Sequence, residues 1–381
     1  MTDLAAARAL LDSRAADELI AELCGAGPGE VSWDVQSWHV RPGADVTAIY
    51  RAQIVDGSTE YPVISTAAPV GARTGRVADL EVSCWLHPDD PGLPGLRSAC
   101  LPATVARWLG WRSSAVTLRS YRPLRRAVLA ATRGQRGAFI KVVPPARTSA
   151  LVSRHTMLAG LGPEVLGEPE PGVLLLSRVP GKALSSVLAD RTNVPGGADL
   201  VALLERLPED ALTLRRRPAW SDRLDFYSAG AREQLPDDAP LDDAVDLLRP
   251  LLADAPVGPV VPTHGDFYEA NIFCCGGVPT HLIDLDSLGP GHLVDDLACL
   301  LGHAAVLPGL SPAHYSGIGE ITAGWLDHFD SVVDPVALRA RTAGVILSLV
   351  VGATPTQASG RFDLVREWIG AARRAEAAKL R

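Results

Sequence analysis

The sequence predicts an α+β protein whose first half is rich in strands and whose second half is mainly helical. Between residues 31 and 177, short runs rich in Val, Trp, Tyr and Leu alternate with turn residues, which is typical of strands. From Lys182 onward, apolar residues recur at the three- and four-residue spacing of helices that pack on a core. The chain has 381 residues, 47% of them apolar, which suffices for two or three domains and excludes disorder as a class.

Residues 1–95 are predicted to form an α+β cap module of their own. A helix is expected at residues 4–23 because Leu10, Leu11, Ile20 and Leu23 share one face. Four strands are expected after it, at residues 31–40, 45–54, 60–66 and 78–86. A segment with three prolines within residues 87–94 marks the boundary of the module.

Residues 96–180 are predicted to form a second β-rich segment. The pattern indicates a helix, three strands, a second helix and a final strand, at residues 101–109, 115–121, 126–132, 138–143, 147–160 and 173–177.

Residues 181–381 are predicted to be helical, with one β-rich insertion at residues 259–286. The expected helices cover residues 198–206, 221–234, 241–253, 293–306, 312–329, 336–352 and 362–380. The insertion is the part of this region that carries recognisable chemistry.

Cysteine usage and hydropathy favour a reduced, cytoplasmic protein without a metal cluster. The six cysteines form no C-x-x-C pair, and no His stands at zinc spacing from them. The longest uncharged apolar run, near residues 343–353, is far shorter than the ~20 residues that cross a bilayer. The charged residues near the N-terminus do not fit a secretory signal. We therefore expect no membrane partner.

The net charge of −8 is concentrated in the second half of the chain. Residues 218–338 contain 19 acidic and three basic residues, a net charge of −16. This region lacks the basic stripe that nucleic acids require, so no nucleic-acid partner is expected. An acidic lobe favours a cationic partner, although a solvated surface that keeps the protein soluble explains the charge equally well.

Two short motifs in the β-rich insertion carry the chemistry. Residues 264–271 read HGDFYEAN, and residues 283–286 read IDLD after a turn that contains two glycines. Phosphoryl transfer needs one carboxylate to take the proton of the acceptor hydroxyl, and an amide and another carboxylate to hold Mg²⁺ against the phosphates. The two motifs contain such groups in Asp266, Asn271, Asp284 and Asp286, and one Asn with one or two Asp suffices for Mg²⁺, which prefers oxygen ligands.

These motifs, followed by Asp296-Leu-Ala at the start of a helix, resemble the aminoglycoside phosphotransferase and choline kinase group of the protein-kinase-like superfamily. The resemblance extends more weakly over residues 101–381. It implies a bilobal kinase-like fold, with residues 96–180 as the nucleotide-binding small lobe and residues 181–381 as the helical large lobe. The cap module lies outside it.

The resemblance also implies roles for individual residues. Asp266 would be the catalytic base, and His264 would brace its loop. Asn271 and Asp284 would bind Mg²⁺, with Asp286 assisting, while Asp296 would tie the loop to the next helix. The implied cofactors are ATP and Mg²⁺.

The small lobe of this family supplies a lysine for the ATP phosphates, and Lys141 stands at the end of an apolar strand at the corresponding place in the order of elements. The family helix after the lysine usually carries a glutamate that pairs with it. This chain has no acidic residue between Lys141 and Glu164, and the aligned position is Arg154.

Two further segments are expected at the nucleotide. Ser177, Arg178 and Val179, before a Pro-Gly pair, resemble the family's hinge, which offers backbone groups to adenine. The hairpin turn that should cover the phosphates contains no glycine, and either Arg125 and Arg126 replace its backbone amides as phosphate contacts or the turn only packs.

The sequence thus favours an ATP- and Mg²⁺-dependent phosphotransferase that acts on a hydroxyl of a small, cationic acceptor, such as an aminoglycoside or a peptide antibiotic. The alternatives are a kinase for Ser or Thr of a ribosomally made peptide, a sugar kinase, and a degenerate kinase fold that serves as a scaffold. The sequence identifies neither the acceptor nor the oligomeric state.

Overall fold

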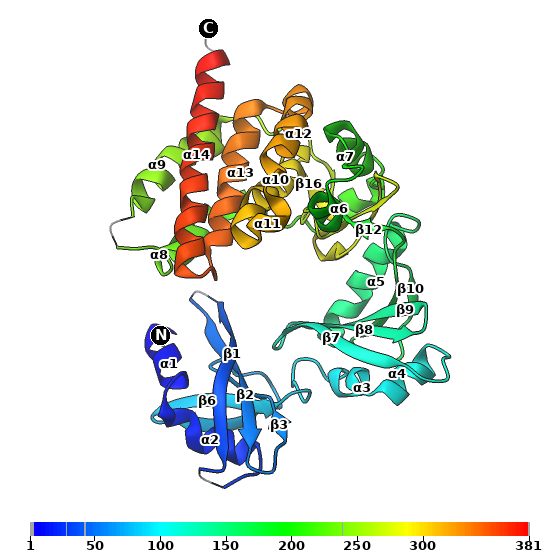
Figure 1. Ribbon diagram of the computed structural model, residues 1–381, viewed down its shortest axis with the longest axis vertical. Helices are drawn as coiled ribbons and strands as arrows, with labels where there is room; N and C mark the ends of the chain where they lie inside the picture. Colours follow the sequence, from blue (N-terminus) through cyan, green and yellow to red (C-terminus); the bar gives the residue numbers. More distant parts are fainter. Residues whose placement is uncertain (1–3, 28, 42, 238, 380–381) are drawn as a thin grey trace. The chain divides into compact units, whose positions relative to one another are not determined.

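The computed structural model describes residues 4–27, 29–41, 43–237 and 239–379, which form two compact units (Figure 1). The first unit contains the described residues of Met1–Val152 and Glu164–Arg178, and the second those of Ser153–Pro163 and Val179–Arg381. Sheets dominate the first unit and helices the second. The predicted α+β class, with a strand-rich first half and a helical second half, is confirmed.

The N-terminal part of the first unit is a six-stranded antiparallel sheet with two helices on one face. Its elements are α1 (Leu4–Leu11), α2 (Asp17–Leu23), β1 (Val31–Arg41), β2 (Asp45–Ile54), β3 (Thr59–Glu60), β4 (Pro62–Ser65), β5 (Arg73–Val77) and β6 (Leu80–Leu86). The strand order is β1-β2-β4-β6-β5, and β3 pairs with β2. Leu11 and Ile20 pack with Tyr50 in the core of this module, and the Tyr50 hydroxyl donates to the Leu11 carbonyl at 2.7 Å.

Two predictions for this module were wrong in detail. The continuous helix expected at residues 4–23 is interrupted at Ser13, whose hydroxyl accepts a hydrogen bond from the backbone of Ala15 and so starts a separate turn. The strand expected at residues 78–86 begins at Leu80, because the chain turns at Ala78, with φ of +51°, after the unpredicted β5.

The rest of the first unit is a five-stranded sheet with helices on both faces. Its elements are α3 (Leu96–Cys100), α4 (Pro102–Trp108), β7 (Ala115–Arg122), β8 (Arg126–Arg133), β9 (Arg136–Val142), the start of α5 (Thr148–Met157), β10 (Val165–Gly167) and β11 (Val173–Ser177). The strand order is β10-β11-β9-β8-β7. The helix predicted at residues 101–109 is α4, whereas α3 was not predicted; α3 ends before Leu101, which precedes a proline and adopts an extended conformation.

The second unit is built around long helices, with two small sheets at the motifs. Its elements are β12 (Lys182–Ala183), α6 (Leu184–Asp190), α7 (Gly197–Leu204), α8 (Leu224–Arg232), α9 (Leu241–Asp254), β13 (Val261–Thr263), β14 (Ile272–Cys275), β15 (Val278–Leu282), β16 (Gly289–Gly291), α10 (Leu293–Leu310), α11 (Pro312–Tyr315), α12 (Ile318–Val332), α13 (Pro335–Val350) and α14 (Pro355–Lys379). The sheets are β12-β14-β15 and β13-β16.

Three helix predictions in this unit need correction. The helix expected at residues 312–329 is two helices, α11 and α12, separated at Gly317. The helix expected at residues 362–380 already begins at Pro355, which supplies a favourable first residue, and residue 380 lies outside the described residues. The short helix α6 was not predicted.

Helix α10 forms the centre of the second unit. It is long and apolar enough to cross a membrane by length and composition, but 61% of its residues are buried inside the protein. It also begins with Asp295 and Asp296, which favour the positive end of a helix dipole. These features are those of a core helix.

Candidate active site

The loop between β13 and β14 is fastened to its surroundings by His264. This side chain is fully buried, and its Nε2 lies 3.0 Å from the carbonyl oxygen of Ile283, at the end of β15. The backbone N–H of His264 donates to Oδ2 of Asp296 at 2.7 Å. Burial lowers the pKa of His264, which favours the neutral imidazole. His264 therefore connects the loop to both the hairpin and α10.

Asp296 holds the same loop from the start of α10. It is 1% exposed, and its second carboxylate oxygen accepts a hydrogen bond from the backbone N–H of Gly265 at 2.8 Å. Burial raises the pKa of Asp296 to about 7, against the effect of the two N–H donors. Gly265 has φ of +75°, and a Cβ atom there would lie 2.6 Å from the carbonyl oxygen of Ser287. The motif therefore requires glycine at this position.

Asn271 connects Asp266 to the returning strand of the hairpin. Its side-chain amide nitrogen donates to the backbone carbonyl of Asp266 at 2.9 Å. The backbone carbonyl of Asn271 accepts a hydrogen bond from the N–H of Ile283 at 2.9 Å. The hairpin turns at Gly276 and Gly277, both with positive φ, which pairs Ile272 with Leu282. This register places Asn271 beside the segment that leads into Asp284.

Asp284 has an unusual backbone conformation. Its φ of +58° and ψ of +60° lie in the left-handed region, which Asp tolerates better than most residues. The short turn Leu285–Ser287, which contains Asp286, follows directly. Residues in such conformations are concentrated at functional sites, where the surrounding structure holds them in place.

The carboxylates of this region raise the pKa values of the same neighbouring side chains. The pKa of Tyr268 is raised first by burial and then by the charges of Asp266, Asp284 and Glu269. Asp284 and Asp286 also oppose the lowering of the His264 pKa. The second unit therefore brings together the predicted residues His264, Asp266, Asn271, Asp284 and Asp286.

The side chains of Asn271, Asp284 and Asp286 offer oxygen atoms, the kind of ligand that Mg²⁺ prefers. Within the described ranges, no group of three or more His, Cys, Asp and Glu side chains is placed to hold a metal ion. Asn271, Asp284 and Asp286 instead offer one amide and two carboxylates, all hard oxygen ligands. The amide nitrogen of Asn271 is bound to the backbone, which leaves its oxygen as the atom for a metal.

The first unit contains the predicted lysine, Lys141, on β9. It is 5% exposed and pairs in the sheet with Val128 on one side and Leu174 on the other. Because successive strand residues point to opposite faces, Lys141 lies on the face opposite Ile140. Arg126, two residues before Val128, lies on the same face as Lys141, while Arg125 lies in the turn between β7 and β8.

The predicted hinge coincides with the passage from the first unit to the second, between Arg178 and Val179. Ser177 is the last residue of β11, and Glu164 occupies both of its polar groups. The backbone N–H of Ser177 donates to the Glu164 carbonyl at 2.9 Å, and its hydroxyl accepts from the Glu164 N–H at 2.9 Å. The side chain of Arg178 packs against Gly137, where a Cβ atom would lie 2.4 Å from it.

Arg154, which stands where the resemblance led us to expect a glutamate, belongs to the second unit. It is 9% exposed, and its Nε donates to the carbonyl of Leu288 at 3.4 Å, directly after the turn that contains Asp286. A basic residue here thus contacts the backbone of the predicted metal turn. The sequence identified the substitution but gave no sign of this contact.

Sequence reasoning missed two buried groups close to the loop. Arg341, on α13, pairs with Asp295 and donates to the Ser221 hydroxyl at 2.8 Å. Glu269, between Asp266 and Asn271, is 6% exposed, and burial raises its pKa to about 7.

A cavity beside the loop contains both signs of charge. Its lining residues are Arg216, Arg217, Pro218, Ala219, Trp220, Thr263, Gly265, Ser287, Pro290, Gly291, Asp295, Asp296 and Cys299. Arg216 pairs with Asp222 at 3.0 Å, and Arg217 lies 3.4 Å from the Ser287 hydroxyl. Arginines, aspartates and hydroxyls therefore meet next to Gly265.

The phosphotransferase enzyme family matches residues 126–325, slightly more than half of the chain. The chain therefore belongs to the phosphotransferase enzyme family, and the predicted relationship and enzyme class are confirmed. No curated protein matches the chain significantly.

Several solved structures are similar at low identity. A thermostable mutant of aminoglycoside phosphotransferase APH(4)-Ia has 18% identity and a TM-score of 0.47, over 73% of this chain and 99% of that one. A choline/ethanolamine kinase family protein from Mesorhizobium loti has 18% identity and a TM-score of 0.48, over 73% and 97%. Aminoglycoside phosphotransferase APH(3'')-Id from Streptomyces rimosus has 20% identity and a TM-score of 0.42, over 62% and 92%.

Proposed function

We propose that the protein transfers the γ-phosphoryl group of ATP, in the presence of Mg²⁺, to a hydroxyl of a small cationic acceptor. The observation that carries the proposal is the cluster around Asp266. The loop that bears it is fixed to α10 through Asp296 and to β15 through His264, and Asn271 bonds to its backbone. Such fixed positioning is the main contribution of a protein to phosphoryl transfer.

In this mechanism, Asp266 accepts the proton of the acceptor hydroxyl as the oxygen attacks phosphorus. Asn271, Asp284 and Asp286 would hold Mg²⁺, which when bound neutralises charge on the phosphates. Lys141 would bind phosphate oxygens from the first unit. His264, neutral because it is buried, keeps the loop in place without adding charge.

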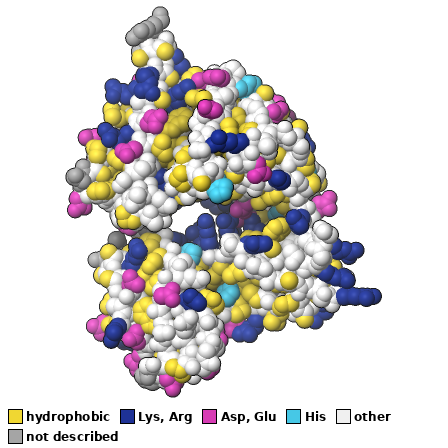
Figure 2. Space-filling view, in the orientation of Figure 1, with side chains coloured by type: hydrophobic (Ala, Val, Ile, Leu, Met, Phe, Trp, Pro, Cys, Tyr) yellow, Lys and Arg dark blue, Asp and Glu magenta, His cyan; other side chains and the backbone are white. Residues whose placement is uncertain are grey.

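The charge of the second unit supports a cationic acceptor. The −16 charge of residues 218–338 favours a cation. On the face seen in Figure 2, however, acidic and basic side chains are interspersed over the second unit, so the acidic excess does not form one uniform field.

The proposal is tested by measuring ADP release with Mg²⁺-ATP and a panel of aminoglycosides, peptide antibiotics and amino sugars. Asp266→Ala should abolish transfer and leave ATP binding intact, because loss of a general base typically costs ~10²–10⁴ in rate. Asp327→Ala, which changes an exposed aspartate on α12, is the matched control. An Asp266→Ala variant with more than half of the wild-type turnover would remove Asp266 from this role.

A further inference from the structure

The turn between β7 and β8 has a conformation that its own residues do not favour. Leu124 has φ of +63°, in the left-handed region that is costly for a residue with a Cβ atom. The backbone N–H of Arg125 donates to the Arg122 carbonyl at 3.0 Å and closes the turn. Residues 121–127 contain no glycine. Such a conformation persists where its surroundings hold it.

Asp90, in the segment before α3, holds this turn. Its side chain is 2% exposed. Oδ2 accepts hydrogen bonds from the N–H of Leu124 and the hydroxyl of Tyr121, each at 2.8 Å, and Oδ1 accepts from the N–H of Gly92 at 2.8 Å. A Cβ atom on Gly92 would lie 2.8 Å from the Cα of Leu124. The segment and the turn are therefore in close backbone contact, fixed by a buried carboxylate.

The N-terminal sheet extends this network. The indole N–H of Trp85, on β6, donates to the hydroxyl of Tyr121 at 3.1 Å. Ile49, Val63 and Trp85 form a small buried cluster against which Tyr121 and Leu124 pack. Residues of the N-terminal sheet thus contact the turn through both a hydrogen bond and apolar side chains.

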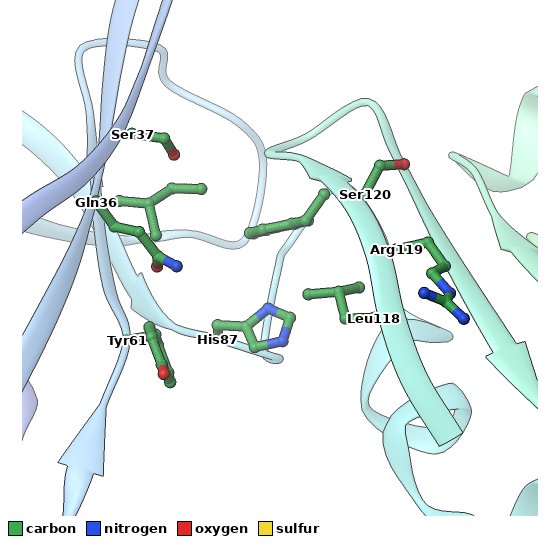
Figure 3. A pocket seen from close by; sticks show the side chains of 9 residues that line it. Gln36, Ser37, Tyr61, His87, Leu118, Arg119 and Ser120 are labelled. Carbon is green, nitrogen blue, oxygen red and sulfur yellow. The ribbon is translucent and has the colours of Figure 1, made fainter. Parts of the chain in front are cut away.

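Beside the network, the junction between the N-terminal sheet and β7 is hollow (Figure 3). The cavity measures about 570 Å³ and is lined by Gln36, Ser37, Ile49, Tyr61, His87, Leu118, Arg119, Ser120 and Tyr121. The His87 ring lies 4.9 Å from that of Tyr121. This part of the junction is therefore open, and the contacts around Asp90, Trp85 and Leu124 lie at its side and fix the turn there.

The turn also lies in a group of arginines. Burial and the charges of Arg41, Arg122 and Arg147 lower the pKa of Arg125, and Asp45 opposes them. Arg41 comes from the N-terminal sheet and pairs with Asp45. Several guanidinium groups held this close create a positive potential that attracts anions such as phosphates.

We propose that Asp90 is a positioning residue for the nucleotide: its bonds to Leu124 and Tyr121 hold the turn so that Arg122 and Arg125 meet the phosphates of ATP. This role rests on the proposed function. Glycine-rich loops in kinases cover the phosphates with a flexible backbone. Here a rigid turn, braced by the N-terminal sheet, presents arginine side chains instead.

The test compares Asp90→Asn with Asp89→Asn. At position 90, the side-chain N–H groups of asparagine would face the groups that donate hydrogen bonds to Asp90. Asp89 is the control because it is exposed and pairs with Arg97. Without nucleotide, Asp90→Asn should raise amide hydrogen exchange in residues 119–127 by about tenfold, as expected for loss of one hydrogen bond. It should also raise the Kd and KM for Mg²⁺-ATP about tenfold with kcat nearly unchanged. Asp89→Asn should match the wild type.

Unchanged exchange in Asp90→Asn would overturn the bracing, and faster exchange with unchanged ATP affinity would overturn the role at the nucleotide. If Asp90→Asn does not fold, Tyr121→Phe, which removes one of the bonds to Asp90, should show a smaller rise in both quantities. Failure of the wild type to bind ATP would instead overturn the proposed function and the nucleotide role with it, while the exchange result would still report on the brace.

Discussion

Asp284 combines an unfavourable backbone conformation with a side chain that the proposed chemistry needs. Asparagine tolerates the left-handed region as well as aspartate does, so Asp284→Asn changes the charge and leaves the turn intact. This makes the position suitable for separating a metal ligand from a structural residue.

We predict that Asp284→Asn lowers the use of Mg²⁺-ATP more than Asp286→Asn does. Removing a ligand charge weakens divalent binding directly. Removal of a group that only supports a metal ligand typically lowers metal affinity or activity about 10–100-fold. The loss of activity in Asp284→Asn should be at least as large. The measurement is kcat/KM for ATP over a Mg²⁺ titration. The ranking fails if Asp286→Asn is more damaging at saturating Mg²⁺.

Glu269 gives a pH prediction. Its pKa rises from an ordinary value near 4.5 to about 7 on burial, so the folded protein binds this proton more tightly than the unfolded chain does. The resulting stability is present below pH ~4.5 and is lost as the pH rises through about 7. We predict that Glu269→Gln, which cannot ionise, gains on the wild type with rising pH, by up to about 3 kcal/mol between pH 5 and 8.

The measurement for Glu269 is the Tm of both proteins between pH 5 and 8, without ligands. Glu320→Gln, on the exposed side of α12, should show a pH-independent difference from the wild type. A Glu269→Gln difference that stays constant over this range would contradict the raised pKa.

The sequence predicted the residues of the loop because the motif joins them within eight positions. The contacts of Arg154 and Arg341 could not be predicted from this motif. Their partners, Leu288 and Ser221, lie 134 and 120 residues away along the chain. Contacts of this kind depend on how helices pack, which periodicity within one segment does not contain.

At the scale of elements, periodicity located almost every long helix and strand, and the errors occurred at their interruptions. The break at Ser13 comes from a side-chain cap, a local effect that a smooth apolar pattern conceals, and the short helix α3, which ends before Leu101 and the following proline, was missed. The strand β10, with three residues, is too short to leave a periodic signal.

The third prediction concerns Lys141, on strand β9. We expect Lys141→Met, which keeps the length of the side chain, to raise the KM for ATP and lower kcat together, with a loss in kcat/KM of about 10²-fold, because a phosphate contact serves both binding and positioning. Lys182→Met is the control, since Lys182 is exposed and pairs with Asp190 at 3.2 Å. Steady-state kinetics decide the matter, and a change in KM alone would assign Lys141 to binding only.

At the scale of the whole molecule, the N-terminal sheet belongs to the same compact unit as the sheet with Lys141. The sequence predicted that residues 1–95 form a module of their own. From the buried contacts of Trp85, Asp90 and Leu93 with the second sheet, we infer that this module shields part of that sheet. Pairing between segments so far apart could not be predicted from composition.

We therefore predict that a chain starting at residue 96 is insoluble or loses ATP turnover and acceptor transfer together. The deletion exposes the apolar residues that Leu93 and Trp85 cover, which costs stability at ~25 cal/mol per Å². Co-expression of residues 1–95 as a separate chain should restore solubility. A soluble truncated protein that keeps its Tm and its ATP hydrolysis would show that the module is dispensable for folding.

The chain has only three lysines, which can therefore be labelled and observed individually by spectroscopy. Of the three, Lys182 and Lys379 have side chains 70% and 44% exposed, whereas Lys141 is 5% exposed on β9. Reductive methylation with ¹³C-formaldehyde should label the first two amines quickly and the third slowly. A carbon NMR spectrum would then contain signals from the three lysines and from the N-terminal amine, and one of the lysine signals comes from the sheet proposed to bind nucleotide. Addition of Mg²⁺-ATP should shift the signal of Lys141 and leave the others in place, so that occupancy of the site can be followed without substitution of any residue.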